Sequence, residues 1–164
     1  MLFPELPGSS KTLVFTASSF LSKPAAESFI LRLSTFIRDW KSHGSGLSAA
    51  STLIANRVLI VAIDESGVSA SGCSLDSLTH FLMAEAPSID WFNRSYVLHR
   101  PHSDSLVSLN DNWSVTAMAE FHALMKSEQL VEGAEVINTT VMTLASARLS
   151  LVEKASESWH AKTV

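Results

Sequence analysis

The run Val58-Leu59-Ile60-Val61-Ala62-Ile63 constrains the fold more than any other stretch of the chain. Its length and its β-branched residues are typical of a strand. A strand with one solvated face alternates apolar and polar residues, whereas this run is apolar at both parities. We therefore predict a central strand that is buried on both faces of its sheet.

The elements around this run predict the fold class. A strand, an amphipathic helix and another strand precede it, and a helix and a further strand follow it. This β-α-β-β-α-β order is the ferredoxin-like pattern, an antiparallel sheet with two helices on one face. We expect an α+β protein whose ferredoxin-like core covers about residues 12–99. The predicted elements are strands over residues 12–17, 47–55, 58–63 and 91–99, a helix over 24–43 that Gly44 ends, and a helix over 75–86.

The C-terminal part is expected to add an α/β extension to the same sheet, so that residues 1–164 form a single domain. Alternating β-branched residues favour a strand over residues 134–142, and a further strand is expected over 104–109. Apolar spacing favours helices over residues 113–129 and 144–154. Near the C-terminus, the indole of Trp159 is expected to dock on the domain.

Composition excludes several classes of protein. The formal net charge of −4 argues against a sequence-independent nucleic-acid binder, which would need a basic surface stripe. A single cysteine cannot form an intramolecular disulfide, so the chain fits a reducing compartment and we expect a cytoplasmic protein. No apolar stretch is long enough to cross a bilayer, so we expect no membrane insertion.

Two segments resemble cofactor sites without meeting their requirements. Gly8-Ser9-Ser10-Lys11-Thr12 has Ser10 where a P-loop needs the glycine directly before its lysine, and it runs into a predicted strand. His99 and His102 could chelate a metal only with further ligands, and no cysteine or acidic cluster with zinc spacing supplies them. The sequence therefore predicts no cofactor and no metal site.

The only cysteine lies in Ala70-Ser71-Gly72-Cys73-Ser74-Leu75-Asp76-Ser77, where the second predicted helix begins. Ser71 or Ser74 suits the N-cap position, because a hydroxyl can accept a hydrogen bond from an amide of the first turn. Cys73 would lie at the positive end of the helix dipole, which favours the thiolate. The structural alternative is a capped helix start with a small buried cysteine.

Polar neighbours complete this candidate site. Gly72 permits a close approach of the backbone to a ligand, and exposed amides here could hold an anion. Asp76 suits the helix dipole, although a carboxylate beside the thiol opposes its ionisation. Asp64 leaves the central strand where open sheets often carry a site, and equally where strands end in solvent. His43 is expected in the last turn of the first helix, as a cation suited to the dipole or as a catalytic histidine.

Four motifs resemble a group of small uncharacterised bacterial proteins that are often labelled "ABC transporter ATPase" in name only. They are Trp40-Lys41-Ser42-His43-Gly44, Val61-Ala62-Ile63-Asp64-Glu65, the cysteine segment, and Ser158-Trp159-His160. The resemblance implies no assigned catalytic residue. The label itself conflicts with the residues, because Asp64-Glu65 imitates the end of a Walker B strand while the phosphate loop and its lysine are missing.

These observations favour a binding or interaction module with its site near Cys73 over an ATPase. The expected ligand is a small molecule or a protein, and the size of the chain is compatible with a homodimer. The residues predicted to bind this ligand are Ser71, Gly72, Ser74, Asp64, Trp159 and His160.

The alternative is a cysteine-dependent enzyme. Cys73 would be the nucleophile, His43 or His160 the base, and Asp64 or Asp76 the residue that orients it. A dithiol mechanism within one chain is excluded, since no second cysteine is present. A redox-sensing thiol is a third hypothesis, and it would need a resolving thiol from another molecule.

Overall fold

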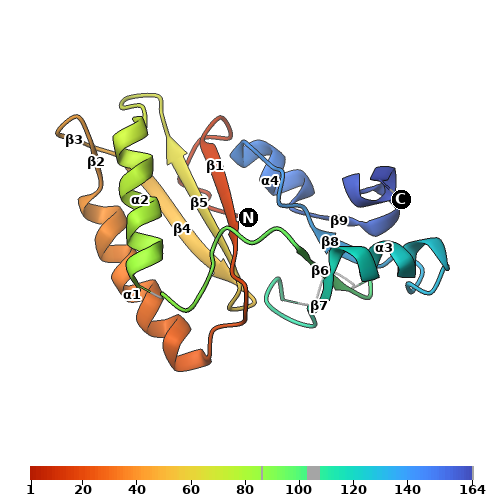
Figure 1. The fold of residues 1–164 in the computed structure, drawn as a ribbon. Coiled ribbons are helices and arrows are strands. Elements are labelled where there is room, and N and C mark those ends of the chain that lie inside the picture. The colour runs from red at the N-terminus through yellow and green to blue at the C-terminus, as the bar shows by residue number, and fades with distance from the viewer. Residues whose placement is uncertain (86, 103–107, 164) are drawn as a thin grey trace.

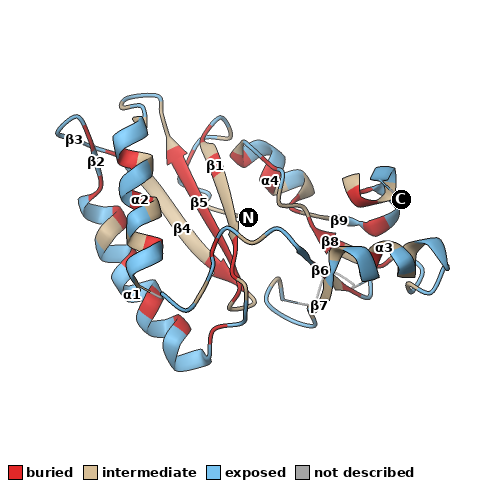
Figure 2. Cartoon of the chain, viewed as in Figure 1, coloured by how far each residue is buried: buried red, intermediate tan, exposed pale blue. Residues whose placement is uncertain are grey.

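The predicted central strand is β5 (Val58–Asp64), which pairs antiparallel with β1 (Lys11–Thr16) on one side and with β4 (Ser48–Ile54) on the other. Its alternate side chains pack into two separate apolar clusters, one on each face of the sheet. Figure 2 shows β5 as the buried strand between its two neighbours. The expectation of a strand buried on both faces is confirmed, since residues 58–63 are all buried.

A computed structural model describes residues 1–85, 87–102 and 108–163 of the protein, and it contains helices and antiparallel sheets (Figure 1). The α+β class is therefore as predicted. One face of the first sheet is covered by α1 (Lys23–Asp39) and α2 (Gly72–Glu85). The predicted last residue of the second helix, residue 86, lies outside the described residues.

Local sequence explains α1. Ser22 caps its start, because its Oγ accepts a hydrogen bond of 3.3 Å from the amide of Ala25, and Pro24 occupies the first turn, where its missing N–H costs nothing. The buried side chains recur at helical spacing and face the sheet. They are Ala26, Phe29, Leu33 and Ile37.

The helix ends before His43, so the prediction that places His43 in its last turn and Gly44 at its C-cap is wrong. Trp40 is extended, with φ −70° and ψ 131°. β2 (Lys41–Ser42) and β3 (Ser45–Gly46) then form a small hairpin. His43 and Gly44 are its two turn residues, with φ 51° and 82°. Two consecutive positive φ values are what a two-residue hairpin turn requires.

The C-terminal part forms a second sheet and does not extend the first. Its strand order is β7-β6-β8-β9, with every pair antiparallel. The elements after α2 are β6 (Tyr96–Arg100), β7 (Ser114–Ala117), α3 (Met118–Lys126), β8 (Glu135–Ile137), α4 (Leu144–Ser150), β9 (Val152–Lys154) and the short 3₁₀ helices η1 (Ala155–Glu157) and η2 (Trp159–Thr163).

The complete ferredoxin-like topology is not confirmed. β1, β5 and β4 have the order expected of three of its strands, but the strand expected beside β1 is β6, which pairs with β7 and β8. The segment before β6 still touches the first sheet, since the amide of Ser18 donates to the carbonyl of Asp90 at 2.8 Å and Trp91 stacks on Phe29. The chain then turns away, and Val97 and Leu98 are buried in clusters with residues of the second sheet.

Two predicted helices are partly strands. The helix predicted from residue 113 begins at Met118, because Val115 and Thr116 pair with β6. The helix predicted over residues 144–154 ends at Ser150 and is followed by β9. The strand predicted over residues 134–142 is confirmed only as β8. Of the strand predicted over residues 104–109, positions 104–107 lie outside the described residues.

Candidate functional site

The structure places Cys73 in the first turn of α2, as an exposed side chain. Ser71 is the capping residue: its Oγ accepts a hydrogen bond of 3.1 Å from the amide of Ser74. The hydroxyl of Ser74 donates in turn to the carbonyl of Ser71 at 2.8 Å, and the carbonyl of Ser74 accepts the indole N–H of Trp40 at 2.9 Å. These polar groups are therefore engaged in holding the helix start to the end of α1.

The other predicted catalytic residues do not assemble around the thiol. Asp64 ends β5, and its Oδ1 accepts a hydrogen bond of 2.9 Å from the amide of Ser66, which lowers the pKa of this carboxyl. Asp76 and His43 are exposed, on α2 and on the β2–β3 hairpin. Within the described residues, no hydrogen bond joins the sulfur of Cys73 to a histidine or a carboxylate.

Trp159 and His160 lie far from Cys73, so the predicted ligand-binding residues divide into two groups. They belong to η2, at the opposite side of the molecule from α2 (Figure 1). Trp159 stacks on His160, with ring centroids 4.0 Å apart. His160 is only 2% exposed, and burial, together with the nearby His122, lowers its pKa to about 4. Its imidazole is therefore neutral at pH 7.

The hydrogen bonds of Ser158 determine the tautomer of His160, that is, which ring nitrogen carries the hydrogen. The hydroxyl of Ser158 donates to the carbonyl of Ala155 at 2.8 Å. The Oγ of Ser158 therefore acts as acceptor toward Nδ1 of His160, 3.1 Å away. Nδ1 carries the hydrogen, and Nε2 is left with a lone pair that can accept a hydrogen bond.

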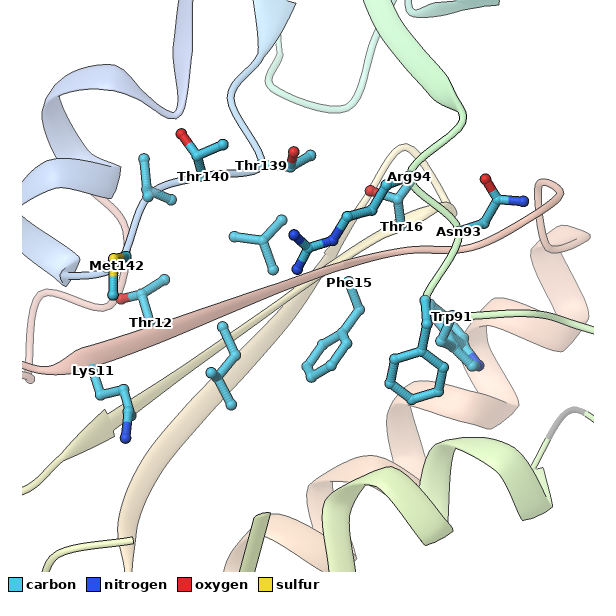
Figure 3. Close-up of a pocket in the computed structure, with 14 residues that line it drawn as sticks. Lys11, Thr12, Phe15, Thr16, Trp91, Asn93, Arg94, Thr139, Thr140 and Met142 are labelled. Atoms are coloured by element: carbon cyan, nitrogen blue, oxygen red, sulfur yellow. The ribbon is translucent and has the colours of Figure 1, made fainter. Parts of the chain in front are cut away.

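A cavity of about 440 Å³ lies beside β1, and we call it the β1 groove. It is lined by all of β1, by residues 91–94 and by residues 139–142. A cavity on one face of a strand would touch only alternate residues, whereas this one touches every residue from Lys11 to Thr16. Figure 3 shows Phe15 on one side of the strand and Thr12 and Thr16 on the other. The β1 groove therefore follows the free edge of the first sheet.

The two flanking segments close this edge at both ends. At one end, the amide of Thr12 donates to the carbonyl of Met142 at 2.9 Å. At the other end, Thr16 forms an isolated parallel bridge with Phe92. Backbone groups alternate in direction along a strand, so the N–H and C=O of Val14 point the same way as the amide of Thr12. No described residue pairs with Val14 on this side.

Among the residues that the structure describes, the lining of the β1 groove carries positive charge and includes no aspartate or glutamate. Lys11 is paired with Glu65, with Nζ and Oε1 3.6 Å apart. Arg94 is exposed and has no hydrogen bond or ion pair within the described part of the chain. Figure 3 shows its guanidinium over the middle of β1.

A smaller cavity of about 140 Å³ opens beside the groove, and we call it the side pocket. Thr16, Arg94, Thr139 and Thr140 line both cavities. Trp159 and His160 line the side pocket only, so these two predicted residues do belong to a concave site. The remaining lining residues are Tyr96, Val97, Leu98, Met118 and Ile137.

Sequence reasoning did not identify Arg94 or the threonines. Thr12 and Thr16 carried a usable signal, since two hydroxyls on one face of an otherwise apolar strand indicate a polar neighbour. Arg94 and Thr139 carried none, because they meet only through the pairing of distant segments.

Among the described residues, no group of three or more histidine, cysteine, aspartate or glutamate side chains could hold a metal ion. None of the described helices is both long enough and apolar enough to span a membrane. Comparison of the chain with protein-family models, with curated proteins and with solved structures found no match. The resemblance to mislabelled ATPases therefore stays a hypothesis.

Proposed function

We propose that the protein is a binding module for an anionic ligand, and that this ligand occupies the β1 groove instead of a site near Cys73. The observation that carries the proposal is Arg94, a cation without a partner among the described residues, over a cavity whose described lining contains no acidic residue. A guanidinium binds a carboxylate or phosphate through two parallel hydrogen bonds. The groove volume is also typical of ligand sites, which range over roughly 300–1,000 Å³.

Binding accounts for the lining residues better than catalysis does. Nucleophilic catalysis needs a hydroxyl or thiol activated by an adjacent base. The Oγ1 of Thr140 donates to Asn138 at 2.6 Å, and the Oγ1 of Thr12 lies 3.5 Å from the carbonyl of Ser10. No lining hydroxyl is hydrogen-bonded to a histidine or a carboxylate within the described residues.

The cysteine-dependent enzyme stays a hypothesis. Its support is the exposure of Cys73 in the first turn of α2. Alkylation of the thiol at a series of pH values tests it, because an activated thiolate reacts well below the ordinary thiol pKa of about 8.5. Alkylation with an apparent pKa at that ordinary value removes the support for an activated nucleophile.

A titration followed by two-dimensional NMR tests the anion site. The probes are succinate, N-acetylglutamate and inorganic phosphate, which separate carboxylate from phosphate recognition. We expect at least one of them to shift the amide of Val14 and the side-chain Nε–H of Arg94. We expect Arg94→Gln to weaken that binding by about tenfold or more, the usual effect of losing a charge-assisted hydrogen bond.

Arg38→Gln is the matched control, since Arg38 is an exposed arginine at the end of α1, outside the lining of the groove. Its affinity for the same probe should equal that of the unchanged protein. The proposal is wrong if no anion shifts the groove resonances, or if Arg94→Gln binds as tightly as Arg38→Gln.

A further inference from the structure

The β1 groove occupies the place where a strand is missing. In the ferredoxin-like order a strand lies beside β1, whereas here β6 joins the second sheet and leaves that position open. β1 is therefore an edge strand whose backbone groups at Val14 have no partner among the described residues. Unpaired groups on a sheet edge are a template for an added strand.

The open part of the edge has a defined length. The flanking segments reach Thr12 at one end and Thr16 at the other. At roughly 3.3 Å per residue these positions are about 13 Å apart, which accommodates about four residues of extended chain. A segment of that length can exchange backbone hydrogen bonds with Val14 at its centre.

Side chains of an added strand would meet different surroundings on its two faces. The residue opposite Val14 projects to the same face as Val14 itself, where Thr139 and Arg94 line the groove. Its neighbours project to the other face, where Leu13 and Phe15 belong to the apolar cluster beneath α1 and α2. An acidic residue between two apolar residues is complementary to both faces.

We infer that the ligand is an extended acidic polypeptide segment, which adds to the first sheet as a strand beside β1. This inference rests on the proposed anion site and commits it to one class of ligand. The backbone of the segment pairs with Val14, its central carboxylate binds Arg94, and its flanking apolar side chains contact Phe15 and the exposed ring of Phe92.

A second copy of the protein does not fit this edge. Its β1 is flanked by the same two segments, residues 91–94 and 139–142, so they would collide before two β1 edges reached pairing distance. A symmetric contact centred on Val14 would also bring Arg94 of each copy toward the other, and like charges repel.

Fluorescence anisotropy with labelled acetyl-Gly-Val-Glu-Val-Gly-amide tests the inference. The first control peptide has glutamine in place of glutamate, and the second has an N-methyl group on the glutamate amide, which removes one backbone donor and keeps the charge. We expect each control to bind about tenfold more weakly, because each loses a hydrogen bond of the strand or of the arginine.

Hydrogen exchange is measured on the unmodified protein, so the result cannot reflect a folding defect of a variant. The amide of Val14 should exchange at least tenfold more slowly with the peptide bound. The amide of Thr12, which donates to Met142 without the peptide, is the internal control and should change little.

The outcomes distinguish strand addition from the anion site on which it rests. If N-acetylglutamate binds as tightly as the peptide, or if N-methylation has no effect, strand addition is wrong and the anion site stands. If neither the peptide nor any simple anion binds, both are wrong. If light scattering shows a dimer in which the amide of Val14 is protected without peptide, a second copy occupies the edge and the inference is overturned.

Discussion

Burial of His160 makes the stability of the protein depend on pH. The folded state holds this imidazole neutral, with its pKa lowered to about 4 by burial and by His122, whereas an unfolded histidine titrates near 6.5. Between these values the unfolded chain binds a proton that the folded chain does not. The free energy of unfolding therefore falls as the pH falls through this window.

The two pKa values set the size of the effect. Through the titration of His160, the free energy of unfolding is about 2 kcal/mol lower at pH 5 than at pH 7, since each unit of pKa difference corresponds to about 1.4 kcal/mol. His99 acts in the same direction, because burial also lowers its pKa. The comparison must therefore isolate His160 from the other groups that titrate.

The variant His160→Asn removes the titration and keeps a donor where Nδ1 bonds to Ser158. The measurement is urea unfolding followed by circular dichroism at pH 7 and at pH 5. Between pH 7 and pH 5, we expect the free energy of unfolding of the unchanged protein to fall by about 2 kcal/mol more than that of the variant. His80→Asn is the matched control, since His80 is exposed on α2, and it should keep the full pH dependence. Equal losses in the unchanged protein and in His160→Asn would refute the reasoning.

The remaining predictions concern local stability, and urea unfolding measures the first two. Ser71→Ala removes the N-cap of α2 and should cost about 1 kcal/mol, whereas the exposed Ser69→Ala should be neutral. Gly44→Ala places a side chain on a residue with φ 82° and should lower the free energy of unfolding by about 1 kcal/mol. Gly46→Ala should lower it less, because Gly46 has open space at its Cβ position and no positive φ. Equal effects of the two substitutions would contradict the turn assignment. Arg148→Met removes hydrogen bonds to three carbonyls of the N-terminal segment, so amides of that segment should exchange faster. Unchanged exchange would show that these hydrogen bonds do not hold the segment in place.

Elements whose cause is local were predicted well from the sequence. The burial of β5 on both faces follows from its own residues, and the start of α2 follows from the serine that caps it. α1 likewise follows from the spacing of its apolar side chains. In each case the determining contacts lie within the element or follow from its periodicity.

Features that depend on the pairing of distant segments were not predicted. The alternation around Val97 indicates a strand but does not say which sheet receives it. Val115 and Thr116 become a strand because β6 offers them a partner. His43-Gly44 is a weak turn signal, and the helical stripe before it favoured a longer helix.

The candidate site shows the same division. Cys73 was noticed because of its residue type, and the structure leaves it exposed in the first turn of a capped helix. Arg94 and Thr139 become neighbours only when β6 and β8 pair in the second sheet. Trp159 and His160 were predicted to bind the ligand near Cys73, whereas in the structure they line the side pocket.

The recessed edge of β1 also bears on solubility. A long exposed strand edge is a hazard, because molecules can stack on one another through it and grow into fibrils. Here the contacts of Thr12 with Met142 and of Thr16 with Phe92 leave only a short interval uncovered. That interval is too short to seed a continuous stack of whole chains, so we expect the uncovered backbone of β1 not to promote aggregation.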